Sequence, residues 1–238
     1  MAGPVALVGS GEYTDAMFDV DAYLLKERPP RYVQIPTAAA PEGDTSLAKW
    51  IGMGEEHAAK LGVEAVPLVV RDRADADDPA MVDRLGDPGL IYFSGGNPLF
   101  LAETFRGTLL WQAIVERWEA GSALGGCSAG AMAFGGWVPD IRHPTKPGLP
   151  GLGLFPHIQV LPHFDKFMGW MPDLMLRPFL RRREGVQLVG IDEDTALVGG
   201  PREFTVWGRS SAWLLNPGGA GGHKREGYAV GATLTIPA

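Results

Sequence analysis

Short apolar runs alternate with amphipathic stretches along the first half of the chain. Residues 5–8 (VALV) and 90–93 (LIYF) are apolar throughout, which is typical of buried strands. Residues 46–61 place apolar side chains at helical spacing and end at Gly62. This alternation predicts a β-α-β-α-β succession, in which parallel strands have helices on both faces. The expected strands are residues 5–8, 32–35, 63–70, 90–93 and 122–126, and the expected helices are 15–26, 46–61, 80–85 and 99–120, the last with a break near Gly107.

The second half of the chain is less regular. Residues 137–153 are rich in Pro and Gly and predict a long lid or binding loop. Residues 165–183 predict a helix interrupted by Pro172 and Pro178. Residues 157–161 predict a strand. Further short strands, expected as an antiparallel extension of the sheet, are residues 187–191, 195–198, 204–207, 213–215 and 233–236. The sequence therefore predicts an α/β fold, a doubly wound and mostly parallel sheet with an antiparallel C-terminal part, in a single domain spanning residues 1–238.

Composition narrows the class of protein. Of 238 residues, 45% are hydrophobic and 21% charged, as in an ordinary globular protein. A net charge of −7 without a basic stripe argues against nucleic acid or an anionic membrane as a partner. The single cysteine excludes an intrachain disulfide, and no run reaches the ~18 apolar residues of a membrane span. The N-terminal residues resemble a first strand rather than a signal peptide, so we expect a cytoplasmic protein.

One segment carries the strongest chemical signal. Residues 126–130 read G-C-S-A-G, after the apolar residues 123–124 and before the small helix-forming residues 131–133. A strand, a sharp turn and a helix around G-x-S-x-G form the context of a nucleophile elbow, with Ser128 at its apex. The backbone N–H of Ala129 is then a natural donor to a developing oxyanion.

Two other interpretations of this segment remain. A tight strand-to-helix turn without chemistry is the simpler one, because this chain is rich in glycine. The other makes Cys127 the nucleophile, as in glutamine amidotransferases, which needs glycines at positions 125 and 129. Gly125 is present but position 129 is Ala, so Ser128 is favoured, and Cys127 is expected to pack as a small apolar residue.

A nucleophilic serine needs a base and a group that orients the base. Among the five histidines, His163 directly follows an apolar strand, where a base would have to stand, whereas His57 is expected in a helix and exposed. Residues 192–194 (Asp-Glu-Asp) offer three carboxylates between two strands, or simply a charged turn. We favour Ser128, His163 and Glu193. The competing set combines Ser128 with Asp192 and His223, in the chain order of α/β-hydrolases.

Four motifs in this order carry a family resemblance: S-G-G-N-P-L-F (94–100), G-G-C-S-A-G-A (125–131), L-P-H-F (161–164) and G-I-D-E-D-T-A-L (190–197). Together they resemble the cyanophycinase and aspartyl dipeptidase (peptidase E) family of serine peptidases, whose fold is similar to that of class I glutamine amidotransferases. The resemblance covers about residues 5–206. It implies these roles: Ser128 as nucleophile, His163 as base, Glu193 as acid, Ala129 with Gly95 or Gly96 as oxyanion donors, and Asn97 beside the substrate.

Substrate preference does not follow from the resemblance. Cyanophycinases have D-Q-H-F and G-G-D-Q where this chain has L-P-H-F and G-G-N-P. We expect small peptide substrates of the dipeptidase type, with acidic or β-aspartyl residues among them, and neither a metal nor a cofactor. A non-catalytic binding protein and a serine esterase are the alternatives. Apolar residues around 167–179 suggest a homodimer surface, and candidate anchors for an acidic side chain are Arg142, Lys146, Lys166 and Arg177.

Overall fold

The larger of two main sheets supplies the framework of the molecule. The computed structural model describes residues 1–140, 143, 146–166, 183–217 and 223–237. The larger sheet has the strand order β14-β11-β10-β1-β5-β4-β2-β3. Strands β1, β5, β4, β2 and β3 are mutually parallel, and the carboxyl ends of the first three are therefore neighbours. Their bounds are β1 (Val5–Val8), β2 (Arg31–Ile35), β3 (Glu64–Pro67), β4 (Leu90–Phe93) and β5 (Ala123–Cys127).

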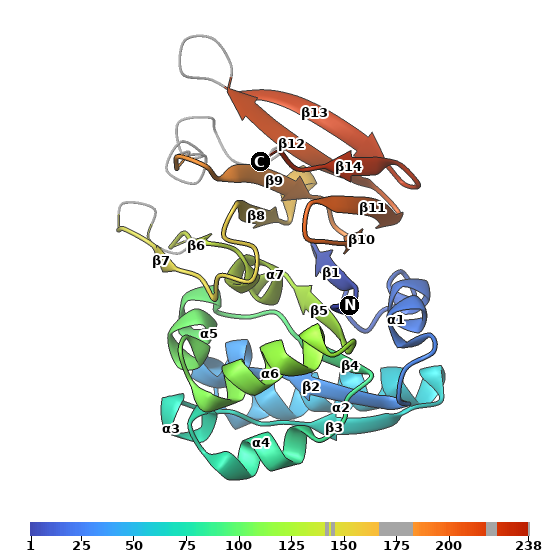
Figure 1. Cartoon of the computed structure of the whole chain (residues 1–238), viewed down its shortest axis with the longest axis vertical. Coiled ribbons are helices and arrows are strands. Elements are labelled where there is room, and N and C mark those ends of the chain that lie inside the picture. The colour runs from blue at the N-terminus through green and yellow to red at the C-terminus, as the bar shows by residue number, and fades with distance from the viewer. Residues whose placement is uncertain (141–142, 144–145, 167–182, 218–222, 238) are drawn as a thin grey trace.

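Antiparallel strands continue this sheet beyond β1. They are β10 (Thr195–Gly199), β11 (Glu203–Gly208) and β14 (Thr233–Thr235), and they confirm the predicted antiparallel part. The remaining C-terminal strands form a second sheet, shown in the upper part of Figure 1. It includes the strands expected at residues 187–191 and 213–215, which were predicted to join the first sheet. Its order is β13 (His223–Ala229), β12 (Ser211–Pro217), β9 (Gln187–Ile191) and β8 (Ile158–Pro162). Apolar runs identify strands but do not say which sheet each one joins.

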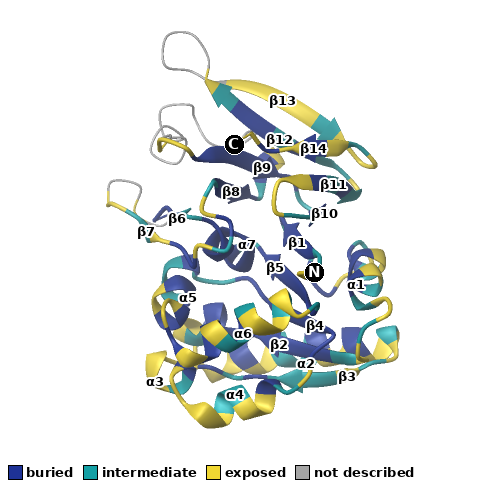
Figure 2. Ribbon diagram, viewed as in Figure 1, coloured by how far each residue is buried: buried dark blue, intermediate teal, exposed yellow. Residues whose placement is uncertain are grey.

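Helices cover both faces of the parallel strands, so the predicted fold class is confirmed (Figure 1). Helices α1 (Phe18–Leu25) and α2 (Asp44–Leu61) pack on the face that carries Tyr32 and Tyr92. The other face, with Ile91 and Phe93, packs on the remaining helices. Figure 2 shows β1, β4 and β5 buried, the edge strand β3 half-buried, and the outer helix faces exposed. The remaining helices are α3 (Arg73–Ala76), α4 (Pro79–Leu85), α5 (Pro98–Phe105), α6 (Leu109–Glu119) and α7 (Ala129–Phe134), besides the 3₁₀ helix η1 (Thr37–Glu42).

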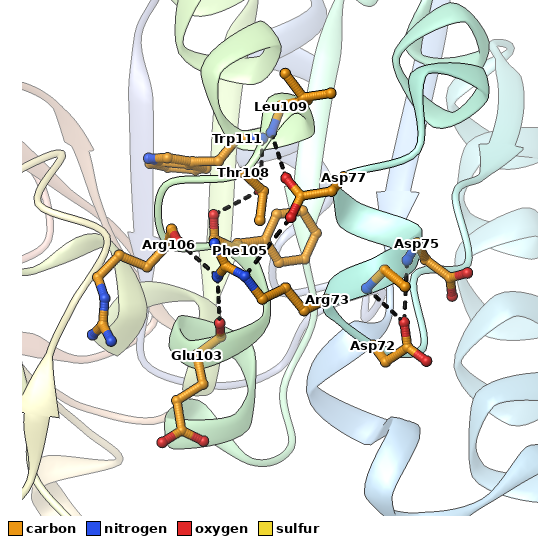
Figure 3. A network of polar contacts seen from close by, with 11 residues as sticks. Asp72, Arg73, Asp75, Asp77, Glu103, Phe105, Arg106, Thr108, Leu109 and Trp111 are labelled. Carbon is orange, nitrogen blue, oxygen red and sulfur yellow. Dashed lines mark hydrogen bonds and ion pairs between the residues drawn. The ribbon is translucent and has the colours of Figure 1, made fainter.

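The helical stretch predicted at residues 99–120 divides into α5 and α6, as the glycine at 107 indicated. Figure 3 shows the contacts between the short helix α3 and the connection from α5 to α6. The Arg73 guanidinium donates to the carbonyls of Glu103 and Arg106, and the Asp77 carboxylate accepts from the Leu109 N–H at 3.1 Å. Thr108 caps α6 by accepting from the Trp111 N–H. The contacts from α3 and the Thr108 cap therefore satisfy backbone groups at the end of α5 and the start of α6, which three residues separate.

Several expected elements differ from the structure. The loop at residues 137–153 contains a two-stranded ribbon, β6 (Trp137–Val138) and β7 (Leu149–Pro150). Strand β13 occupies part of a segment expected to be a polar turn. The helix expected at 165–183 and the apolar residues 167–179 lie largely or wholly outside the described residues. Among the described helices, none has the length and apolar character needed to cross a membrane.

His57 is buried, which corrects its expected exposure. It lies in α2 with 2% of its surface exposed, and its Nε2 lies 2.9 Å from Asp21 Oδ2. Asp21 belongs to α1 and is itself fully buried. Burial raises the pKa of the Asp21 carboxyl, and its interactions with His57 oppose that rise. The polar residues around His57 suggested that its side chain is exposed. Its partner Asp21 lies on another helix, and the local sequence does not indicate that contact.

Candidate active site

A strained turn presents Ser128 between β5 and α7. Ser128 has φ 49° and ψ −101°, a backbone conformation that L-residues rarely adopt. The flanking glycines are required by close packing. A Cβ on Gly126 would lie 2.7 Å from the Phe134 ring, and one on Gly130 would lie 2.5 Å from the Phe93 carbonyl oxygen. The geometry is that of a nucleophile elbow, with the side chain projecting where the strand ends.

His163 and Glu193 extend from the second sheet toward this serine. The Ser128 Oγ lies 2.7 Å from His163 Nε2, a hydrogen-bonding distance. On the other side of the ring, His163 Nδ1 lies 3.5 Å from Glu193 Oε1, and both side chains are about one-third exposed. His163 follows β8, Glu193 follows β9, and these neighbouring strands are parallel, so both residues emerge at the same edge.

The loop that carries Glu193 is held by residues 165–166, which follow His163, and by Thr195. The Asp165 carboxylate accepts from the Glu193 backbone N–H at 3.1 Å. The Lys166 ammonium lies 3.6 Å from Glu193 Oε2, the oxygen that does not face His163. The hydroxyl of Thr195 donates to the Glu193 carbonyl. The candidate acid is therefore connected to the candidate base through the backbone as well as through the side chains.

The loop after β4 borders the serine. The point that a Cβ on Gly95 would occupy lies 3.7 Å from Ser128 Cβ. The Gly95 N–H donates to Glu12 Oε1 at 2.9 Å, so it is already engaged. Of the two expected glycine donors, this leaves the Gly96 N–H for an oxyanion. Asn97, expected beside the substrate, uses its carboxamide oxygen to cap α5 by accepting from the N–H groups of Leu99 and Phe100.

Glu12 is a site residue to which the sequence motifs assign no role, although its turn, residues 9–12, is expected at the same sheet edge as Ser128. It lies in the turn after β1 and is 7% exposed. Its Oε2 accepts a hydrogen bond from the Cys127 thiol, with 2.8 Å between Sγ and Oε2. The available signal was its place in a polar turn at the carboxyl end of a buried strand, where ligands gather in sheets of this type.

Cys127 is the last residue of β5 and is fully buried. Burial raises the pKa of its thiol well above the usual value of 9.0, and the nearby Glu12 charge adds to the rise. A thiol held in its protonated form is a poor nucleophile. The Cys127 sulfur contacts Glu12, whereas His163 contacts the Ser128 hydroxyl.

In the competing set, the Asp192 side chain is engaged in contacts with residues 210–213. The Asp192 carboxylate, 3% exposed, accepts hydrogen bonds from the Ser210 hydroxyl, the Ser211 N–H and the Trp213 indole. His223 begins β13 and pairs through its backbone with Pro217. The Asp192 side chain thus connects its loop to β12.

Another histidine, His157, contacts the Pro201 carbonyl with Nε2 at 3.0 Å, and burial lowers its pKa.

The candidate substrate anchors are only partly described. Lys166 is engaged with Glu193, and Lys146 is exposed in the loop between β6 and β7. Arg142 and Arg177 lie outside the described residues. In the part of the chain that the structure describes, no group of three or more His, Cys, Asp or Glu side chains is arranged to hold a metal ion.

Known proteins resemble this chain in sequence. Cyanophycinases from Synechococcus elongatus and from Thermosynechococcus vestitus (strain NIES-2133 / IAM M-273 / BP-1) are each 34% identical to it over 170 residues. Each match covers 66% of this chain and 51% of the relative. The chain therefore spans about half the length of the curated relatives it matches.

Solved structures resemble it in fold. A peptidase from an acI-B1 Actinobacterium is 37% identical with a TM-score of 0.89, and the match covers 99% of this chain and 98% of that one. A putative peptidase E protein from Listeria monocytogenes EGD-e is 18% identical with a TM-score of 0.58, covering 97% and 100%, and bears on the fold alone.

The family model of Peptidase family S51 matches residues 5–206. That range includes the elbow, the end of β8 and the loop that carries Glu193. The family resemblance drawn from the motifs is thereby confirmed, and so, at the level of the family, is the expected class of hydrolase. The chain belongs to Peptidase family S51.

Proposed function

We propose that this protein is a serine peptidase of the dipeptidase type, acting on small peptides. The proposal assigns Ser128 as nucleophile, His163 as general base and Glu193 as the carboxylate that orients the imidazole. The single observation that supports it best is the 2.7 Å distance between Ser128 Oγ and His163 Nε2 at the apex of an elbow. Nucleophile and base are within hydrogen-bond reach, as this chemistry requires.

In this mechanism Ser128 Oγ bonds to the scissile carbonyl carbon while its proton passes to His163 Nε2. The carbonyl oxygen becomes an oxyanion, which accepts hydrogen bonds from the backbone N–H groups of Gly96 and Ala129. The tetrahedral species collapses, the C–N bond breaks, and His163 gives its proton to the leaving amine. Water then attacks the acyl-enzyme by the same route and restores the serine.

Glu193 accepts from His163 Nδ1–H and stabilises the imidazolium that forms. Its 3.5 Å separation is longer than a strong hydrogen bond. Such contacts commonly tighten when substrate binds. Lys166 and Asp165, which follow His163 in the chain, contact the side chain and the backbone N–H of Glu193 and so limit its movement.

Substrates with acidic or β-aspartyl residues are part of the proposal, as the family resemblance suggests. The cyanophycinase relatives extend well beyond the matched region, which covers 51% of their length. A cytoplasmic site of action also belongs to the proposal and is compatible with a single cysteine.

The test is a mass-spectrometric cleavage assay with Asp-Xaa, Glu-Xaa, β-Asp-Xaa and neutral dipeptides. The wild-type protein should release free amino acids from at least one class, whereas Ser128→Ala should release none above background. Cleavage that persists in Ser128→Ala would contradict the serine mechanism. No cleavage of any dipeptide by the wild type would contradict the dipeptidase assignment.

A further inference from the structure

We propose that Glu12 is a positioning residue for the oxyanion-binding loop, an inference that rests on the proposed function above. Glu12 is almost wholly buried beside the site, and each of its carboxylate oxygens has its own donor. Oε1 accepts from the Gly95 N–H at 2.9 Å, and Oε2 accepts from the Cys127 thiol at 2.8 Å. One side chain therefore connects the loop after β4 to the residue that precedes the nucleophile.

This connection fixes the peptide group that carries the Gly96 N–H. The preceding peptide is held by the Gly95 bond to Glu12, and the following one by the Asn97 N–H, which donates to the Ala38 carbonyl at 2.7 Å. Gly96 itself has φ 138° and packs so closely on Ala38 that a Cβ would overlap it. With both neighbours held, the peptide between Gly95 and Gly96 has a defined orientation, as an oxyanion donor requires.

The turn that carries Glu12 is itself held in place. The Gly9 N–H donates to the Thr195 carbonyl at 2.9 Å, and the Thr14 hydroxyl donates to the Gly11 carbonyl at 2.6 Å. Gly9 also packs against the backbone of Asp192 so tightly that a Cβ would overlap it. The same turn therefore touches the loop of the candidate acid, the loop of the candidate oxyanion donor and the residue before the serine.

Loss of the Glu12 acceptor would leave the Gly95 N–H buried without a partner. The loop would then reorient to satisfy that donor, and the Gly96 N–H would lose its alignment. A group that aligns an oxyanion donor affects the bond-making step more than the initial binding of a ligand. This distinguishes a positioning role from a purely structural one, which would lower stability and leave the bond-making rate of the folded protein intact.

A fluorophosphonate probe tests the inference without knowledge of the natural substrate. Ser128 Oγ bonds to phosphorus, fluoride leaves, and the hydroxyl proton goes to His163, while the phosphoryl oxygen occupies the oxyanion position. The matched variants are Glu12→Met, which keeps the length of the side chain but has no comparable acceptor, and Glu12→Gln, which keeps one oxygen for the Gly95 N–H. The rate of phosphonylation, kinact, and the initial binding constant, KI, are measured separately.

We expect Glu12→Met to lower kinact by 10-fold or more, and we expect its KI and the kinact of Glu12→Gln to stay within about 3-fold of wild type. Asp21→Asn is the control, because Asp21 is a buried carboxylate on the same face of the sheet that contacts His57 and Tyr32 instead. It should lower the melting temperature without lowering kinact. If Glu12→Met does not fold, Glu12→Asp replaces it with the same expectation, because the shorter side chain withdraws from Gly95.

Equal kinact values for Glu12→Met and the wild type would overturn the inference while leaving the proposed function standing. Equal losses in Glu12→Met and Glu12→Gln would also overturn it, since Gln keeps the acceptor. A wild-type protein that does not react with the probe would overturn the proposed function, and this inference with it.

Discussion

Phe164 packs against Gly190 so closely that a Cβ at position 190 would lie 2.5 Å from the Phe164 Cγ. Gly190 lies in β9, opposite Leu161 in β8, and the phenyl ring folds back over it. Phe164 is 3% exposed, and its ring centroid lies 6.0 Å from that of Trp213. The residue after His163 is thus anchored in a small apolar cluster, which holds the imidazole in its place at the end of β8.

Gly190→Ala should therefore lower activity as well as stability. The added methyl group displaces Phe164 and, through the backbone, His163, so we expect a loss of about 1–3 kcal/mol in the free energy of unfolding. We expect a loss of about 10-fold or more in kcat, because small displacements of a catalytic group are costly. Chemical denaturation and steady-state kinetics measure the two effects.

Gly52→Ala is the matched control. Gly52 lies within α2, and nothing stands within 4 Å of the position that its Cβ would take. The substitution should stabilise the protein by about 0.5–1 kcal/mol and leave kcat unchanged. A Gly190→Ala variant as active as Gly52→Ala would show that Phe164 does not position the base.

Glu193 and Asp192 are neighbours with different expected roles. Glu193→Gln should lower kcat by roughly 10²–10⁴-fold with little loss of stability, because an amide cannot stabilise the imidazolium as a carboxylate does. Asp192→Asn should lower the free energy of unfolding by about 1–3 kcal/mol, because its three hydrogen-bond donors lose part of their acceptor. Its kcat per folded molecule should stay near wild type. The opposite pattern would favour Asp192 as the catalytic acid.

Cys127 should not react in the folded protein. Its burial and its raised pKa keep the thiol protonated and inaccessible. Iodoacetamide at pH 8.5 should label less than about one-tenth of the native protein in the time that labels the denatured chain completely. Intact-mass spectrometry measures the labelled fraction. Rapid labelling of the native protein, accompanied by loss of activity, would make Cys127 a candidate nucleophile again.

Stability should fall above about pH 9. Burial raises the pKa of the Cys127 thiol above 9.0 and that of the Tyr13, Tyr32 and Tyr92 phenols well above 10.0. The unfolded chain therefore loses these protons at a lower pH than the folded protein does. Because the folded state then binds more protons, the free energy of unfolding decreases as the pH rises, by up to about 1.4 kcal/mol per pH unit for each such group.

Urea denaturation between pH 7 and pH 10.5 measures this slope, and Tyr92→Phe isolates one contribution to it. The Tyr92 hydroxyl is buried and has no hydrogen-bond partner within the described structure, so its removal should cost little at pH 7. The variant should lose less stability than the wild type between pH 9.5 and 10.5. Identical slopes would show that this phenol does not retain its proton in the folded state.

Local signals in the sequence pointed to Ser128 and His163, whose side chains lie 2.7 Å apart in the structure. Ser128 was recognisable because glycines, small residues and a preceding apolar run all belong to the same 15-residue segment. His163 was recognisable because it directly follows an apolar strand. Among the three carboxylates at 192–194, the sequence pattern only favours Glu193. Their side chains separate in space, since Asp192 turns into β12 whereas Glu193 faces His163.

Features that depend on distant contacts could not be predicted in this way. Glu12 acquires its place only when the turn after β1 meets the loop after β4, 83 residues away in sequence. The burial of His57 in α2 depends on contact with α1, which supplies its partner Asp21. Strand β13 was missed because its exposed charged residues, 224–226, resemble a solvated turn. In each case pairing partners decide the structure, and local pattern does not reveal them.

The central claim, that Ser128 is the nucleophile, is tested most directly by locating the fluorophosphonate adduct. The wild-type protein is labelled, digested and analysed by tandem mass spectrometry, beside Ser128→Ala and His163→Ala. We predict one adduct on Ser128 in the wild type, none in Ser128→Ala, and labelling slowed by several orders of magnitude in His163→Ala. An adduct on any other residue, or full labelling of Ser128→Ala, would contradict the account.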